Sequence, residues 1–269
     1  MNKLQQAVAM LHEVDSEAGK RSSKSRIHPA SRLFVCVLFI LITVSFHKYN
    51  VMGLLSMWLY LLITGIWEEF SFWKGLKRIR YILLLIVLLG TANLFFDRNV
   101  IFCLGSMNIT GGMISMATLL IKGMLTVYAA YFLLMETGIE GICAALRTFG
   151  VPKGGVTVIL LIYRYLILLL KEVQRMSQAY QLRAPGQKGI HIRTWGSFVG
   201  LLLLRTMERA GDIYDSMLLR GYQGEYRQQE VLGGRISRGL SGIYAAAWTL
   251  VLLFLRVFPV FQMVGNLLG

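Results

Sequence analysis

Two arginines, Arg183 and Arg220, end helical stretches in a similar way, and their chemistry suits contact with a partner protein. Each follows an amphipathic run, and a helix-stopping residue comes soon after, Pro185 in the first case and Gly221 in the second. A guanidinium has a permanent charge and a fixed fork of donors, so each could leave its helix and enter a groove on a partner. An arginine at a helix C-terminus can instead bond the last carbonyls of its own helix. The residues alone leave both interpretations open.

The elements that must position these arginines form two copies of one plan in residues 156–220. Each copy begins as an apolar helical stretch, becomes amphipathic, and ends in its arginine. Helices of this kind lie along a membrane surface, with their polar ends in the cytoplasm. Between the copies, Gly196 and Gly200 form a G-x-x-x-G pattern that allows two helix backbones to approach closely. We therefore predict that the two helices cross at these glycines.

The composition places the whole chain in a membrane. Of its 269 residues 55% are hydrophobic and only 16% are charged, and the mean hydropathy is +0.57. In soluble domains about a quarter of all residues are charged. These values exclude an ordinary cytosolic enzyme and a disordered chain, and they predict an all-α integral membrane protein.

Apolar stretches divide the chain into about five transmembrane helices and a region of different character. We expect a basic segment over residues 1–32, four spans over 33–135, a coupling region over 136–238, and a last span over 239–269. The first apolar stretch is short for a span, so we expect Arg32 and Lys48 to reach out to the two interfaces. Lys122 lies inside the fourth span, where we expect it either to snorkel or to find a partner within the bundle.

The formal charge of +14 is explained by topology. Lys and Arg number six in residues 1–32, four in 67–80 and fourteen in 136–238, but one each in 47–50 and 97–112. Cytoplasmic segments collect Lys and Arg, so the N-terminus, the 67–80 loop and the coupling region are predicted to be cytoplasmic. The protein is then multi-pass in the cell (inner or plasma) membrane, with membrane lipid around it and no nucleic-acid partner.

Both arginine segments resemble signatures of a known family. Ser216-Met-Leu-Leu-Arg220-Gly221-Tyr222-Gln-Gly224 is similar to the second Ala-Arg-Gly-type motif of the transmembrane T component of energy-coupling-factor (ECF) ABC importers, and Ala179-Tyr-Gln-Leu-Arg183-Ala184 is similar to the first. Val14-Asp15 and His28-Pro29 resemble the cobalt and nickel branch, the CbiQ type. Ala184 stands where the family favours Gly, and Ser216 and Leu219 stand where Ala is common.

The resemblance implies a non-catalytic transducer subunit of a cobalt or nickel importer. ABC ATPase subunits would bind the cytoplasmic face, and a separate membrane subunit would bind substrate. The coupling residues carried over by the two motifs are Ala179, Arg183, Ala184, Ser216, Arg220 and Gly221. A T component shared among vitamin-binding subunits is the alternative within transport.

Other chemistry is weakly represented in the sequence. No P-loop pattern occurs, so ATP hydrolysis belongs to another polypeptide. The four histidines are too scattered for a helical ligand pair, and we expect neither a metal site nor a cofactor on this chain. The paired Glu68-Glu69 suggests an intramembrane hydrolase, but the facing apolar segments supply no histidine, and we favour an interfacial pair flanked by tryptophans.

Overall fold

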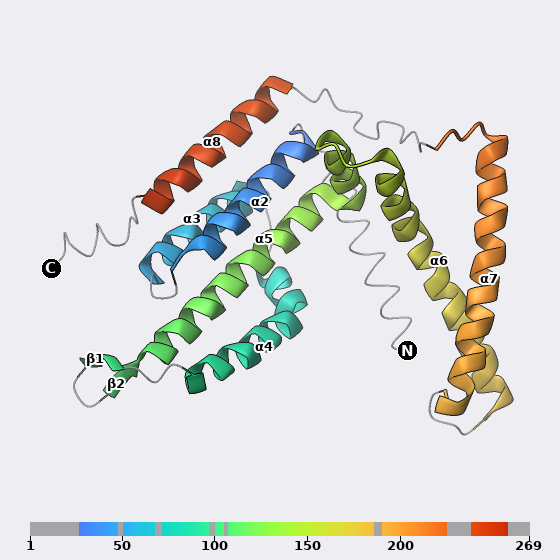
Figure 1. Ribbon diagram of the computed structural model, residues 1–269, viewed down its shortest axis with the longest axis horizontal. Helices are drawn as coiled ribbons and strands as arrows, with labels where there is room; N and C mark the ends of the chain where they lie inside the picture. The colour runs from blue at the N-terminus through green and yellow to red at the C-terminus, as the bar shows by residue number, and fades with distance from the viewer. Residues whose placement is uncertain are drawn as a thin grey trace. The chain divides into compact units, whose positions relative to one another are not determined.

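A computed structural model describes residues 27–47, 51–67, 72–96, 100–104, 107–185, 190–224 and 238–257. Helices make up nearly all of this part, as the sequence predicts (Figure 1). In chain order the elements are α2 (Pro29–Ser45), α3 (Val51–Trp67), α4 (Phe72–Phe96), β1 (Val100–Leu104), β2 (Met107–Thr110), α5 (Gly111–Thr148), α6 (Lys153–Arg183), α7 (Ile192–Leu219) and α8 (Arg238–Val257).

The small sheet is a departure from the predicted all-α fold. β1 and β2 pair antiparallel between α4 and α5, with Cys103 opposite Asn108 and Leu104 opposite Met107. The turn residues Asn99, Gly105, Gly111 and Gly112 instead predict a connection without strands over residues 97–112. The apolar run of β1, Val-Ile-Phe-Cys-Leu, has the β-branched and aromatic residues that favour strands, but five residues are too few for periodicity to distinguish a strand from a short apolar loop.

The chain divides into two compact units. The helix-bundle unit comprises the described residues up to Glu136 together with α8, and the hairpin unit comprises those from Thr137 to Gly224. The division falls inside α5, where Gly138 has the non-helical angles φ 68° and ψ 167°. α5 therefore contributes its first part to the helix-bundle unit and its last part to the hairpin unit.

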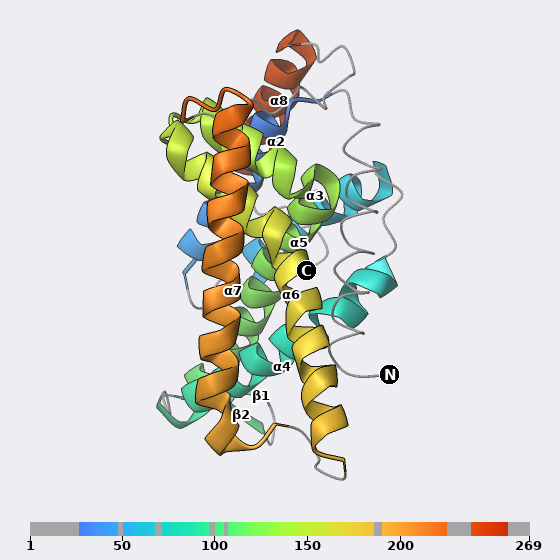
Figure 2. The same ribbon diagram turned by 90° about the vertical axis from the view of Figure 1, so that its right-hand side faces the viewer.

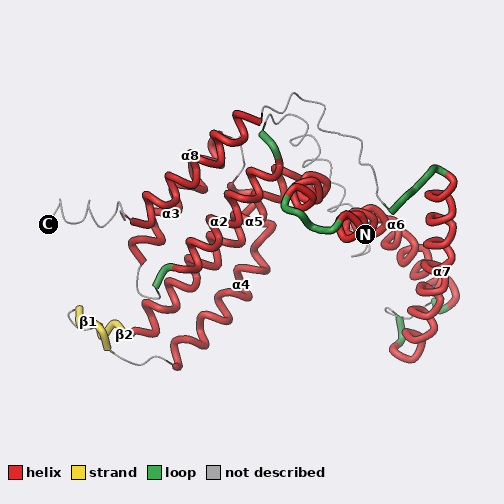
Figure 3. The backbone as a smooth tube through the Cα atoms, turned by 45° about the horizontal axis from the view of Figure 1, so that its top comes forward, coloured by secondary structure: helices red, strands yellow, loops and turns green. Residues whose placement is uncertain are grey.

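In the helix-bundle unit, α8 packs on α2 and α3, and α5 completes a shared apolar core (Figure 3). Tyr60 of α3 stands at its centre, stacked on Phe39 of α2 and edge-on to Trp248 of α8. Ile79 of α4 joins this core, but most large apolar side chains of α4 face outward, with Leu84 65% and Leu88 61% exposed. An outward apolar face of this kind suits contact with lipid.

Apolar helices occur at all five predicted spans. Two of them, Gly112–Thr148 and Gly239–Val257, are long and apolar enough to cross a membrane. Three others are shorter: Pro29–Ser45, Val51–Ile66 and Ile79–Thr91. Helix as the structural class and apolar helix as the type of element are confirmed, and the number of crossings stays a prediction.

Lys122 finds its partners within the bundle. Its Nζ donates to the main-chain carbonyl of Val44 at 3.1 Å and to that of Phe46, both at the C-terminal end of α2. The last carbonyls of a helix lack helical donors and carry the negative end of its dipole. A cation placed there stabilises the end of α2.

The N-terminus of α2 explains why histidine precedes proline there. His28 is the N-cap residue, and its Nδ1 accepts from the N–H of Ala30 at 3.1 Å. Pro29 follows at the first helical position, where a missing N–H leaves no bond unmade. The N–H of His28 in turn donates to the hydroxyl of Ser241 on α8 at 2.9 Å.

We therefore expect His28→Ala to lower the free energy of unfolding by about 1 kcal/mol, the usual effect of removing an N-cap acceptor. His28→Asn keeps a side-chain acceptor at the cap and should remain close to wild type. Thermal unfolding of both variants in detergent, followed by circular dichroism, measures the difference. Equal stability of the two variants would contradict this role for the ring.

The hairpin unit begins at Thr137, next to the break in α5. Its first helical segment packs through Cys143 against Val156 and Leu160 of α6. α6 and α7 run antiparallel (Figure 2): residues near the start of α6 contact residues near the end of α7, and residues near the end of α6 contact residues near the start of α7. Tyr180 meets Thr194 beside the turn, and Glu172 meets Arg205 further along.

Candidate functional site

The end of α7 shows how its sequence presents Arg220. Arg220 is the C-cap residue, and Gly221 follows with φ 79°. The N–H of Gly221 donates to the carbonyl of Leu218 at 2.9 Å, and that of Tyr222 donates to the carbonyl of Met217 at 3.0 Å. This is the Schellman pattern, which needs a left-handed residue after the cap. Glycine at 221 therefore stops α7 directly behind the arginine.

The end of α6 reaches the same result differently. Its C-cap residue, Ala184, has φ −127°, and its N–H donates to the carbonyl of Tyr180 at 3.1 Å. These angles suit any residue, so no glycine is needed where the family favours one. Pro185 follows and cannot continue the helix. Arg183 is thus the last helical residue of α6.

Small residues precede both arginines by one turn. Ala179 and Ser216 each lie four residues before their arginine, on the same helix face, and both are exposed. The Ser216 hydroxyl donates to the carbonyl of Ile213 at 2.8 Å, so it stays close to the helix. Only small side chains therefore stand beside each arginine on its helix face, which leaves space for a partner protein.

Both guanidinium groups are exposed, and within the described residues neither side chain bonds a protein group. At these helix ends the carbonyls of Tyr180, Met217 and Leu218 accept from backbone N–H groups instead. Within the described residues, neither arginine therefore caps the carbonyls of its own helix.

A leucine precedes each arginine and is even more exposed. Leu182 is 83% exposed and Leu219 is 90% exposed. Leu182 is not among the residues predicted from the sequence, and Leu219 appears there only as a departure from the family's alanine. The repeated Leu-Arg dipeptide is a signal that could have found both. We call Leu182 with Arg183 and Leu219 with Arg220 the two tips. Each tip combines a charge with an apolar group, as protein interfaces do.

The antiparallel pairing places the tips at opposite ends of the hairpin (Figure 2). α7 has 28 residues, and a helix rises 1.5 Å per residue, so the tips are separated by about 40 Å. Between them, Glu172 binds Arg205 and lies 3.9 Å from Arg175. These contacts hold the tips on one element.

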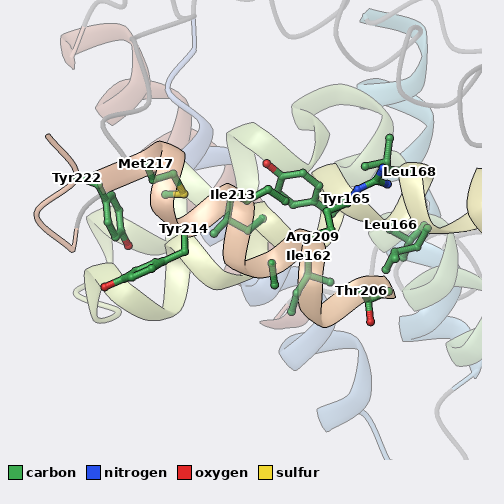
Figure 4. A pocket seen from close by; sticks show the side chains of 13 residues that line it. Ile162, Tyr165, Leu166, Leu168, Thr206, Arg209, Ile213, Tyr214, Met217 and Tyr222 are labelled. Atoms are coloured by element: carbon green, nitrogen blue, oxygen red, sulfur yellow. The ribbon is translucent and has the colours of Figure 1, made fainter. Parts of the chain in front are cut away.

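An apolar pocket of about 460 Å³ lies between α6 and α7, toward the end that carries Arg220 (Figure 4). Leu161, Ile162 and Leu166 line it from α6, and Ile213 and Met217 line it from α7. Figure 4 shows Tyr214 and Tyr222 at one end of the pocket and Thr206 toward the other. The Met217–Tyr222 contact that closes the Schellman pattern is thus also a wall of this pocket.

The predicted crossing at Gly196 and Gly200 is absent from the described chain. A Cβ built on either glycine would meet nothing within 4 Å. The reason is helical phase, because α7 turns Thr194, Phe198 and Leu202 inward and leaves both glycines about half a turn away. Close approach occurs instead in the bundle, where a Cβ on Gly123 of α5 would lie 2.9 Å from Ile86 of α4.

The prediction for the side chain of Arg32 was wrong. Arg32 does not reach an interface, because its side chain is 5% exposed and its Nη2 lies 2.7 Å from Glu136 Oε1. The same guanidinium donates through Nη1 to the main-chain carbonyl of Glu136 at 3.4 Å. Lys48, the other residue predicted to reach an interface, lies outside the described residues.

The described residues hold no cluster of three or more His, Cys, Asp or Glu side chains that could bind a metal ion. Glu68-Glu69, considered above for hydrolase chemistry, and Val14-Asp15 lie outside the described ranges. Residues 1–26 of the basic segment predicted over 1–32 also lie outside them.

Comparison with known proteins places these features in a family. A relative from Methanocaldococcus jannaschii, named only as the uncharacterized protein MJ1571, is 30% identical over 119 residues, which is 43% of this chain and 40% of that protein. The chain thus spans less than half the length of this relative. A family model described as cobalt transport protein, CbiQ, matches residues 20–231, which include α2 to α7 and both tips. The chain belongs to the CbiQ family of cobalt transport proteins, whose role is membrane transport.

Proposed function

We propose that this protein is the transmembrane T component of an ECF-type importer for cobalt or nickel ions. It carries no ATPase site of its own, and it couples ATP hydrolysis by two partner ATPases to a separate substrate-binding membrane subunit. The observation that carries this proposal is the pair of exposed Leu-Arg tips at opposite ends of one antiparallel hairpin.

Two tips with the same chemistry suit two copies of the same kind of groove. Each tip offers one guanidinium and one leucine, so each ATPase would supply an acidic or carbonyl-lined socket with an apolar edge. A change in the separation of the two ATPases during the ATP cycle would act on both ends of the hairpin. Because the Tyr180–Thr194 and Glu172–Arg205 contacts join α6 to α7, the hairpin would tilt or rotate as one element.

The substrate-binding subunit would contact the face of α7 that is turned away from α6. Apolar side chains at helical spacing form an exposed stripe that faces away from α6: Val199, Leu203, Met207 and Leu218, each at least 47% exposed. Gly196 and Gly200 lie on this same face, with open space above them. A small-xxx-small pattern lets a second helix approach closely, and we assign that helix to the membrane partner.

The glycine assignment predicts a selective loss. Gly196→Leu should lower capture of the substrate-binding subunit about tenfold or more, because a side chain there would hold the partner helix away. Capture of the ATPases should be unchanged, because a Cβ at Gly196 meets nothing within 4 Å and displaces nothing in the hairpin. Ser197→Leu adds the same side chain on a different face of α7 and is the matched control. Equal capture by both variants would contradict the assignment.

The function itself is tested by reconstitution. The chain is placed in liposomes with two ABC ATPase subunits and a metal-binding membrane subunit from the same organism, and entry of radioactive cobalt is followed. ATP-dependent entry that stops when the chain is omitted supports the proposal. Entry without the chain, or ATP hydrolysis by the chain alone, would rule it out.

A further inference from the structure

A buried ion pair at the break in α5 provides a further inference, which rests on the proposed function. Arg32 and Glu136 are 104 positions apart in sequence, and their side chains are only 5% and 8% exposed. Phe132 of α5, Tyr60 of α3 and Tyr244 of α8 line the space around them. Removing either charge would leave the other buried without its counter-ion, which is strongly unfavourable.

The geometry of the pair concerns the backbone as well as the charge. Nη2 of Arg32 binds the carboxylate of Glu136 at 2.7 Å, and Nη1 reaches its main-chain carbonyl at 3.4 Å. Gly138 interrupts the helix two residues later. Carbonyls just before a helix break lose the regular donor four residues on. Arg32 therefore acts as a side-chain cap for the segment of α5 that belongs to the bundle.

We propose that Arg32 and Glu136 are positioning residues for transport, which clamp the last turn of α5 before the break to α2. Without the clamp, the turn containing Glu136 and Thr137 would unwind when force reaches it through Gly138. With the clamp, the same force moves the bundle. The pair thus decides whether a movement of the hairpin moves the bundle or only unwinds this turn of α5.

The test measures ions transported per ATP hydrolysed in the reconstituted complex. We expect Glu136→Gln to lower this ratio about fivefold or more while the ATPases stay bound and active, because the break in α5 yields under load. The charge-swapped double variant, Arg32→Glu with Glu136→Arg, should regain at least part of the ratio. Glu140→Gln removes an exposed carboxylate just beyond the break and is the matched control. A pair with a merely structural role would lower the yield of complex and leave the ratio unchanged.

Hydrogen exchange on the purified chain gives a readout that does not depend on transport. Amides of residues 133–137 should exchange about tenfold faster in Glu136→Gln than in wild type, and those of the α6–α7 hairpin should not change. If Glu136→Gln fails to fold, Arg32→Lys replaces it, since lysine keeps the charge but lacks the planar fork that reaches two acceptors.

The outcomes separate the two proposals. If the wild-type complex shows no ATP-dependent uptake, the proposed function fails, and hydrogen exchange alone decides whether the clamp exists. If wild type couples and the variant keeps its ratio and its exchange rates, only the clamp is wrong.

Discussion

Reversing both tip charges, Arg183→Glu with Arg220→Glu, should abolish ATP-dependent uptake and release the partner ATPases. Each arginine would meet a groove with one permanent charge and up to five donors, and losing such a contact at an interface costs about 2–4 kcal/mol. Each single reversal should therefore weaken capture of one ATPase about 30- to 1,000-fold.

The separation of the tips makes the prediction quantitative. Sites about 40 Å apart on a helix pair with no shared partner should contribute additively. The loss of binding free energy in the double variant should equal the sum of the two single losses. This additivity is measured by titrating each variant with purified ATPase in detergent.

The fold should survive these changes, since neither guanidinium bonds another group in the described structure. Lys171→Glu is the matched control, because it reverses an exposed charge in the middle of α6 without touching a tip. If the double variant and the control retain equal capture and uptake, the tips have no coupling role.

The helix ends that carry Arg183 and Arg220 were predictable because their information is local. An amphipathic period, a terminal arginine and a following helix-stopping residue all lie within one turn of each other, as at Arg220 and Gly221. Helical stretches were predictable for the same reason. The strand pair β1–β2 was missed because each strand is too short to show a period.

What the sequence could not show depends on phase and on distant partners. Gly196 and Gly200 have the spacing of a crossing motif, but spacing does not say which face of α7 meets α6. Arg32 stands at the edge of an apolar run, where snorkelling is the usual outcome. Its partner, Glu136, belongs to another helix and an acidic residue in that position has many possible roles. Only the packing of α2 on α5 distinguishes these outcomes.

The break at Gly138 supports a second strong prediction. With φ 68° and ψ 167°, this residue lies in a region that is essentially open to glycine alone. We expect Gly138→Ala to lower the free energy of unfolding by about 1–3 kcal/mol, the usual strain for a side chain in such a conformation. A lower thermal midpoint in detergent is the direct measure.

Relief of that strain should also harm transport, because alanine favours a continuous helix by about 1 kcal/mol over glycine. A straightened α5 would redirect the segment after Gly138 and restore a helical donor to the carbonyl of Glu136, which Arg32 otherwise reaches. Uptake should then fall even at temperatures where the variant is folded. Gly154→Ala is the matched control, because a Cβ at this position in α6 meets nothing within 4 Å and should leave stability equal or slightly higher. If Gly138→Ala matched this control in both stability and uptake, the bend in α5 would be neither strained nor required, since a straight helix would then serve as well.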